Sequence, residues 1–356
     1  MALLIAPLFT AGIAVGGIQN ANAGGPITIV VDDDGEVGVV PPTSAADCDA
    51  TGITADIENN IQDAIDGASP GDTVVVCPGQ YSESVDIDKA ITVEGIQKPE
   101  VDGTSNGSPA FIINADGVVL SGFKALSTDD DCIVINSNDN KVLGNLVEDC
   151  LRDGILVIGN NNRIAGNRVE NVQSDGIVVE GTNNIIKGNV VNESSTDGID
   201  LESGADNTIV QGNTVTNTGS DGMEVSSDDN TIKGNTVTNS GNGGITLFSS
   251  VQNNFVEQNT STENRDGLKI FGDDNTIRRN NANNNTDEGI DVGFQAEGNT
   301  FTQNTTNENG NLGIDDDSVG GDPTGTANTY NKNKCRNNGD SDDDGSDPDG
   351  LCSPQN

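Results

Sequence analysis

An acidic residue recurs along the middle of the chain, followed by Gly and an apolar residue, except at Asp131, where Cys132 takes the place of the Gly. The steps between successive copies are 22, 22, 22 and 24 residues, and the series runs Asp131, Asp153, Asp175, Asp197 and Asp221. One structural repeat of this length would stack these carboxylates along one edge, about 4.8 Å apart. At that spacing two carboxylates repel by roughly 1 kcal/mol in water. We therefore expect Ca²⁺ at Asp131, Asp153, Asp175 and Asp197; the alternative is that each Asp caps the turn before its Gly.

The C-terminal tail carries a second acidic pattern. Asp340, Asp342 and Asp344 precede Gly345 with the spacing of the first six positions of a calcium-binding loop, Asp-x-Asp-x-Asp-Gly. Leu351 stands where such a loop has its Glu. The pattern indicates either Ca²⁺ ligation by these three residues or an acidic disordered tail.

Composition excludes several kinds of site and partner. The chain has no His and only two Met, so a copper site is not expected. Asp and Glu number 57 against 16 Lys and Arg, which gives a formal net charge of -41. This charge argues against nucleic acids and anionic membranes as partners.

Short strands must position these acidic residues. Apolar residues alternate after each Asp-Gly pair, as in Ile155/Val157 and Ile177/Val179, and a period of two indicates a strand. Further apolar columns keep the same register, so each repeat holds three strands separated by turns rich in Gly, Asn and Asp. Three such strands form one triangular coil of a solenoid, in which every strand pairs with its copy in the next coil. Leucine-rich repeats are the nearest rival, but the periodic Leu is missing.

An Asn recurs once in each repeat, as at Asn145, Asn167 and Asn189. We expect it to adopt the left-handed conformation of a sharp turn, and its amide to hydrogen-bond from coil to coil. A row of sugar-binding Asn residues is the functional alternative.

The two ends of the repeat region need caps, because terminal coils expose the core. A helix is predicted over 56–67, with Ile57, Ile61, Ala64 and Ile65 on one face. The predicted organisation is a signal peptide over 1–23, an N-terminal extension over 24–55, the parallel β-helix over 56–335 and an acidic tail over 336–356.

The N-terminus and the cysteines both indicate export. Residues 3–17 are apolar, and Ala21-Asn22-Ala23 matches a signal-peptidase site, with a membrane anchor as the alternative. We expect a secreted, cell-surface or periplasmic protein that inserts into no membrane after signal cleavage. An even number of cysteines in an exported chain indicates disulfides rather than free thiols, and proximity pairs them as Cys48/Cys77, Cys132/Cys150 and Cys335/Cys352.

The chain resembles the pectin-lyase-like superfamily of right-handed parallel β-helices. Ile61 to Ile65, Pro70 to Val74 and Pro78 to Tyr81 are similar to the N-terminal entry of that superfamily, and the Gly-Ile…Asn-x-Ile-x-Gly-Asn rhythm is similar to its repeats. Such repeats also occur in the carbohydrate-binding and sugar-hydrolase repeat domain and in the copper-binding NosD proteins. The resemblance implies an all-β right-handed parallel β-helix with a short N-terminal capping helix.

One segment is similar to the Asp-Asp-Cys strand motif of polygalacturonases, namely residues 128–135. By that resemblance, Asp130 and Asp131 would be the catalytic carboxylate pair of a hydrolase. The His of that family is replaced here by Arg152-Asp153-Gly154. A Ca²⁺-dependent polyuronate lyase would instead use Asp129, Asp130, Asp131 and Asp153 as metal ligands, and Arg152 or Arg163 as the base.

Two classes of function follow. The uniform repeat, the absence of His and the incomplete catalytic set favour a non-catalytic extracellular scaffold or glycan-binding module that is stabilised by Ca²⁺. The alternative is a polysaccharide-degrading enzyme, either a hydrolase or a lyase. The expected partner is a polysaccharide or a cell-surface glycan, and the sequence indicates no oligomeric state.

Overall fold

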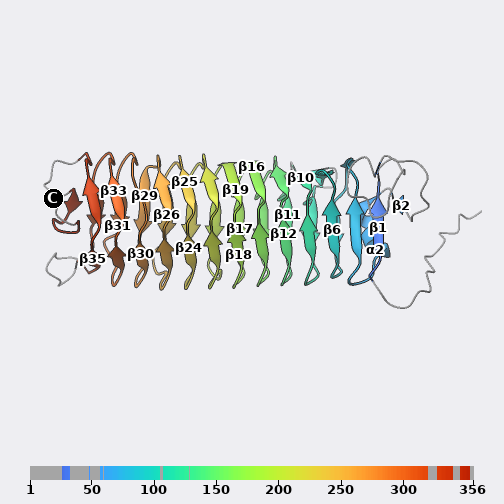
Figure 1. The fold of residues 1–356 in the computed structure, drawn as a ribbon, viewed down its shortest axis with the longest axis horizontal. Coiled ribbons are helices and arrows are strands. Elements are labelled where there is room, and N and C mark those ends of the chain that lie inside the picture. The colour runs from blue at the N-terminus through green and yellow to red at the C-terminus, as the bar shows by residue number, and fades with distance from the viewer. Residues whose placement is uncertain are drawn as a thin grey trace, which may run out of the picture.

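The protein is an elongated parallel β-solenoid whose coils stack along its long axis (Figure 1). The computed structural model describes residues 26–32, 48, 57–58, 60–104, 107–127, 129–319, 327–339 and 345–352. Successive copies of a strand pair in parallel and in register, as Val142 does with Ile164 and Ile164 with Ile186. The predicted all-β parallel β-helix with coils of about 22 residues is confirmed.

Sheet A forms one long side of the solenoid and contains 14 strands. Its middle residues point inward, because side chains alternate between the two faces of a strand. In spatial order the strands are β2 (Ile57–Glu58), β1 (Thr28–Val31), β3 (Thr73–Val76), β6 (Thr92–Gly95), β9 (Val119–Ser121), β12 (Lys141–Leu143), β15 (Arg163–Ala165), β18 (Ile185–Lys187), β21 (Ile209–Gln211), β24 (Thr231–Lys233), β27 (Phe255–Glu257), β30 (Thr276–Arg278), β32 (Thr300–Thr302) and β35 (Thr329–Asn331).

Sheet B forms the second side and contains nine strands, followed by a separate pair toward the C-terminus. The nine strands are β4 (Gln80–Tyr81), β7 (Glu100–Asp102), β10 (Lys124–Leu126), β13 (Leu146–Glu148), β16 (Arg168–Val172), β19 (Val190–Ser194), β22 (Thr214–Thr216), β25 (Thr236–Thr238) and β28 (Thr260–Thr262). The pair consists of β33 (Thr305–Asn307) and β36 (Lys334–Arg336). The regular strand pairing of sheet B ends in the region where the inward Val of earlier coils is replaced by Ser261, Ala282 and Thr306.

Sheet C contains 12 strands and carries the Asp-Gly repeat at its N-terminal edge. In chain order the strands are β5 (Val85–Ile87), β8 (Phe111–Ile113), β11 (Ile133–Ile135), β14 (Ile155–Val157), β17 (Ile177–Val179), β20 (Ile199–Leu201), β23 (Met223–Val225), β26 (Gly243–Leu247), β29 (Asp266–Ile270), β31 (Ile290–Val292), β34 (Ile314–Asp316) and β37 (Ser346–Asp347). Two residues of each regular strand point into the core and the one between them points outward.

Stacked aliphatic side chains fill the interior. Ile133, Ile155 and Ile177 follow one another along the axis and are inaccessible to solvent. Full burial of such a side chain contributes roughly 1.5–3 kcal/mol, which is how a chain so rich in Asp, Asn and Gly can fold.

Buried Asn side chains form ladders at the corner between sheets A and B. The Asn145 amide donates to Oδ1 of Asn167 at 3.1 Å, and Asn167 donates to Oδ1 of Asn189 at the same distance. The predicted stacking of amides from coil to coil is therefore confirmed. The predicted left-handed backbone at these Asn residues is wrong, because the preceding Gly adopts it, with φ of 65° at Gly144 and 66° at Gly166. Gly takes up this conformation without steric cost, so the Asn keeps an ordinary backbone and turns its amide inward.

The N-terminal end is closed by α2 (Ile61–Gly67), whose side chains Ile61, Ala64 and Ile65 are buried. This helix is shorter than the predicted 56–67, because Ile57 and Glu58 pair with β1 as strand β2. Asn60 is its N-cap, and its side chain accepts a hydrogen bond from the Asp63 N–H at 3.2 Å. Strand β1 lies within the predicted N-terminal extension and pairs with β3 along its whole length.

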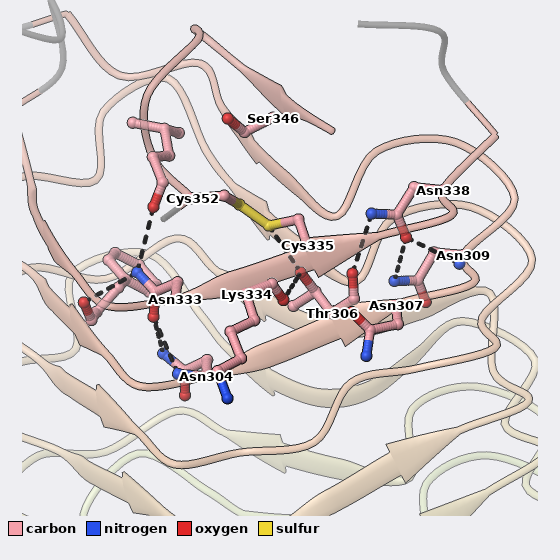
Figure 2. The surroundings of a disulfide bond; sticks show 12 residues. Asn304, Thr306, Asn307, Asn309, Asn333, Lys334, Cys335, Asn338, Ser346 and Cys352 are labelled. Carbon is pink, nitrogen blue, oxygen red and sulfur yellow. Dashed lines mark hydrogen bonds between the residues drawn. A yellow bond between two sulfur atoms is a disulfide. The ribbon is translucent and has the colours of Figure 1, made fainter. Parts of the chain in front are cut away.

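The C-terminal end is closed by a disulfide between Cys335 and Cys352 (Figure 2). Beside it, Asn333 continues the amide ladder by accepting a hydrogen bond from Asn304 at 3.1 Å. Asn333 also donates a hydrogen bond to the carbonyl of Leu351 at 3.4 Å. This hydrogen bond links the C-terminal segment to the last coil.

The three predicted disulfides, Cys48–Cys77, Cys132–Cys150 and Cys335–Cys352, are confirmed. The predicted signal peptide and the tail carboxylates Asp340, Asp342 and Asp344 lie outside the described residues. No helix in the part of the chain that the structure describes is long and apolar enough to cross a membrane.

Candidate functional site

The repeat Asp residues form a continuous row, which we call the Asp ladder. Each carboxylate accepts a hydrogen bond from the backbone N–H of the next ladder residue. The donor–acceptor distances are 2.9 Å from Asp153 to Asp131, 3.1 Å from Asp175 to Asp153, and 2.6 Å both from Asp197 to Asp175 and from Asp221 to Asp197. The ladder carboxylates therefore link neighbouring coils, rather than capping the turn within their own coil.

Asp130 and Asp131 lie at the start of this row. Asp131 is only 3% exposed, and burial raises the pKa of its carboxyl group. Asp130 accepts a hydrogen bond from the Asp131 N–H at 3.0 Å and forms an ion pair with Arg152 at 3.3 Å. Arg152, the proposed base, has its own pKa raised by the charge of Asp131 and by its hydrogen bond to Asp130, so it stays protonated. Both carboxylates thus have structural partners in this arrangement.

A second row runs along the outer face of sheet C, one outward side chain per coil. Its chemistry changes along the axis, from apolar to acidic and then to mixed. In order, the residues are Val134, Leu156, Val178, Asp200, Glu224, Thr246, Lys269, Asp291 and Asp315. The acidic part of this row meets the Asp ladder on strands β20 and β23.

Four carboxylates gather there, and we call Asp197, Asp200, Asp221 and Glu224 the acidic cluster. Ligand oxygens of Asp197, Asp221 and Glu224 lie within 4.8 Å of one another. Asp200 is paired in register with Glu224 and is 7% exposed. Its buried Oδ1 has no hydrogen-bond partner. A buried carboxylate oxygen without a partner is costly, which indicates that a positively charged group belongs beside it.

Burial disfavours the ionised forms of this cluster. It raises the pKa of Asp197 to about 7 and that of Asp200 to about 8, and the neighbouring carboxylates add to both shifts. The pKa values of Asp221 and Glu224 are also raised, again chiefly by burial. A bound cation would reverse these shifts, because it favours the charged form of every carboxylate around it.

A second group of carboxylates on the same face has cations of its own. Ligand oxygens of Asp266, Asp287 and Glu288 also lie within 4.8 Å of one another. Lys269 forms an ion pair with Asp266 at 3.1 Å, and Arg265 lies 3.7 Å from Asp287. The acidic cluster differs: among the described residues, no Lys or Arg lies within ion-pairing distance of its four carboxylates.

Sequence reasoning identified only part of this site. Asp197 was expected as a metal ligand and Asp221 as a ladder residue, and the structure brings both into the cluster. Asp200 and Glu224 were missed, although a signal was present in the sequence. The residue between two inward aliphatic positions changes from Val178 to Asp200 and then to Glu224. Asp131, Asp153 and Asp175 lie on the same ladder, outside this four-residue cluster.

Comparisons with known proteins identify the architecture. A family model described as the right-handed beta helix region matches residues 90–215 and 175–338. No protein of curated function matches the sequence. The chain is similar to XylC in its complex with xylose, with a TM-score of 0.60 and 10% identity over 89% of this chain and 86% of that one.

Two further solved structures are similar in the same way. The Dettilon tailspike protein gp208 superposes with a TM-score of 0.59 and 18% identity over 76% of this chain, which spans 64% of the tailspike chain. The A-module of the mannuronan C-5 epimerase AlgE4 from Azotobacter vinelandii superposes with a TM-score of 0.58 and 15% identity, over 78% of this chain and 89% of that one. At these identities the likeness concerns the fold.

Proposed function

The chain belongs to the right-handed beta helix family, and from this premise we propose that it is an extracellular, non-catalytic protein that binds an anionic polysaccharide through Ca²⁺. The observation that carries the proposal is the acidic cluster, with its buried and unpartnered Asp200 oxygen. The disulfides agree with a secreted or periplasmic location, since such bonds persist in oxidising compartments.

Ca²⁺ suits the cluster better than other metals do. It accepts six to eight oxygen ligands in flexible geometry, and carboxylates from two neighbouring coils supply oxygens only. Copper would require His, Met or free Cys, and the chain has no His and no free cysteine. Asp197, Asp221 and Glu224 would bind the ion, and the carboxylate of Asp200 would add a further negative charge beside it.

The negative net charge of the chain limits the ways in which it could bind an anionic ligand. A chain with a formal charge of -41 repels a polyuronate at long range. A divalent cation on the surface of sheet C removes this repulsion locally and offers open coordination positions to a uronate carboxylate. Lys269, three strands further along the face than Asp200, supplies a second positive charge.

Two observations favour binding over catalysis. Proton abstraction needs a neutral base, and the Lys269 side chain is engaged in ion pairs with Asp266 at 3.1 Å and Asp291 at 3.8 Å. The charge of Asp131 and the hydrogen bond to Asp130 raise the pKa of Arg152, so this side chain stays protonated. Hydrolysis by Asp130 and Asp131 is the second candidate function, and the raised pKa of Asp131 favours it, because a general acid must hold its proton.

A retention assay on immobilised polysaccharides tests the proposal. Polygalacturonate, alginate and neutral xylan are compared in Ca²⁺ and in chelator, with Asp221→Asn and Glu224→Gln as test variants. Glu94→Gln is the matched control, because it removes one exposed charge from sheet A. We expect the wild type and the control to be retained on a polyuronate in Ca²⁺ only, and both test variants to elute early. Equal elution with and without Ca²⁺ contradicts the proposal.

The same samples distinguish binding from turnover. Unsaturated uronate absorbance reports a lyase, and new reducing ends without it report a hydrolase. Neither signal is expected. Product that disappears in Asp130→Ala or Asp131→Ala would make the chain an enzyme and would overturn the non-catalytic assignment.

A further inference from the structure

Three phenylalanines lie together on the surface of a chain that is poor in aromatic residues. The sequence has eight Phe and no Trp, so a group of three is a large share of its aromatic side chains. Phe248 is 40% exposed and Phe294 is 65% exposed. With Phe271 they line a hollow of about 410 Å³. Exposed aromatic rings that gather in one place indicate a contact surface, since leaving them in water forgoes the benefit of burial.

The backbone of sheet C builds this hollow. Phe248 and Phe271 follow the ends of β26 and β29 directly, and Gly293 follows the end of β31. A Cβ at Gly293 would collide with Cδ1 of the Phe271 ring and would also lie 3.1 Å from Cε1 of that ring. The ring of Phe271 therefore lies against the next coil, which has no side chain at position 293. The side chain of Phe294 lines the hollow beside it. We call Phe248, Phe271 and Phe294 the phenyl ledge.

We propose that the phenyl ledge is a platform for a pyranose ring of the bound polysaccharide. One face of a pyranose presents C–H groups with a slight positive charge, which suits the electron-rich face of an aromatic ring. Polar groups for the hydroxyl and carboxyl substituents stand beside it. The Lys269 ammonium lies 5.6 Å from the centre of the Phe271 ring, and Asp291 lies 3.8 Å from that ammonium.

A protein partner fits this surface less well. A stable protein interface buries about 800 Å² on each side, and three rings bordered by charged residues offer an apolar area well below that. A sugar ring matches the size of the hollow and the mixture of apolar and charged groups around it. The ledge also lies on the same face as the acidic cluster, so one ligand can contact both.

The distance between the acidic cluster and the phenyl ledge sets the minimum length of a ligand that contacts both. Strands β23, β26, β29 and β31 are neighbours in sheet C, so Glu224 and the coil of Phe294 are three steps apart, roughly 14 Å. A single sugar cannot span this distance. The inference rests on the proposed function in this respect, because it assigns the cation and the ledge to one oligosaccharide that crosses the strands along the solenoid axis.

Uronate oligosaccharides of increasing length test the ledge by calorimetry in Ca²⁺. Phe248→Ala and Phe294→Ala change exposed residues, so the fold is expected to persist. Ile209→Ala is the matched control, because Ile209 is 39% exposed on sheet A. We expect each Phe variant to bind a hexasaccharide roughly threefold to tenfold more weakly than the wild type, the control to bind equally, and all proteins to bind a disaccharide alike. Equal hexasaccharide binding by the wild type and both Phe variants overturns the ledge and leaves the cation site standing.

A spectroscopic readout separates failure of the ledge from failure of the proposed function. The chain has no Trp, so Phe294→Trp places one fluorophore on the ledge. A change in its emission on addition of a uronate hexasaccharide in Ca²⁺ supports the ledge. If no uronate binds any of the proteins, the proposed function has failed; neutral xylohexaose then decides, because a change in emission supports a sugar platform without the cation and constant emission overturns it.

Discussion

The side chain of Lys269 lies against Gly243, in the space that a side chain at position 243 would fill. A Cβ built on Gly243 would be 2.9 Å from Cδ of Lys269 and 2.8 Å from Oδ1 of Asp221. The Lys269 ammonium reaches back to Oδ1 of Asn242 at 3.4 Å. Gly243 is also the position where the Asp ladder lacks a carboxylate. This interruption therefore lets a lysine and the acidic cluster share one face of the solenoid.

Gly243→Ala should crowd this arrangement and lower the free energy of unfolding by about 1–3 kcal/mol, as overpacking typically does. Lys269→Ala removes one of the three side chains that would be displaced, the others being Thr246 and Asp221. The double variant should therefore be more stable than the sum of the single effects predicts, and a thermal or denaturant unfolding cycle measures this coupling. Additive effects would show that the two residues do not compete for the same space.

Ca²⁺ should stabilise the folded protein against heat. Binding to the native state alone contributes RT ln(1 + [L]/Kd), or about 2.7 kcal/mol at a concentration one hundred times Kd. Scanning calorimetry should show a higher Tm in Ca²⁺ than in chelator for the wild type, and little difference for Asp221→Asn. Equal melting temperatures of the wild type in both buffers would rule out a stabilising Ca²⁺ site.

Stability without metal should decrease as the pH rises from about 4 to about 8. Burial, with nearby Asp266, raises the pKa of Glu288 to about 8, and burial, with Asp317 and Asp291, raises that of Asp315 to about 6. The folded state therefore keeps protons that the unfolded chain releases, and stability falls as the pH rises through this interval. Asp315→Asn and Glu288→Gln cannot ionise and should melt at higher temperature than the wild type at pH 8, but not at pH 4. Melting curves across this range would contradict the assignment if the difference were the same at both ends.

The buried amide ladder should be far less tolerant of change than amides on the surface. Asn189 donates to the Ile164 carbonyl at 2.9 Å and to Asn213 at 3.1 Å, and accepts from the Asn167 N–H at 2.9 Å. Asn189→Ala leaves these buried groups unpaired, at a cost of about 1–3 kcal/mol for each unsatisfied group. Asn136→Ala removes an exposed amide contact with Asn114 and should cost less than about 0.5 kcal/mol. Denaturant titration of the two variants compares these costs directly, and similar losses would argue against a structural role for the ladder.

The interior was predictable from the sequence because every coil must satisfy the same constraint. Ile155, Ile177 and Ile199 recur at fixed spacing since each packs on its copy, so period and register can be read directly. The conformation of the ladder Asn was misassigned because two neighbouring residues, Gly144 and Asn145, were both able to make the turn. Their sequence order alone does not reveal which of them takes the positive φ.

The outer face was predictable only in part, for a related reason. Side chains such as Asp200, Glu224 and Phe248 point outward from sheet C, and no stacking partner in the core requires them to recur. Their significance comes from neighbours that are 22 to 24 residues away in the chain, so it becomes visible once the coils are aligned. The change from Val178 to Asp200 at one outward position is a local signal of this kind.

Because the coils stack regularly, the distance between two sites on the solenoid surface is a whole number of coil steps. Each coil contacts only the coils before and after it, so duplication or loss of one repeat would leave the packing on either side unchanged. Insertion of one repeat between Glu224 and Phe248 would increase the separation of the acidic cluster and the phenyl ledge by a single step of about 4.8 Å. The length of ligand that reaches both sites would then change in discrete increments, while every side chain in either site stayed the same.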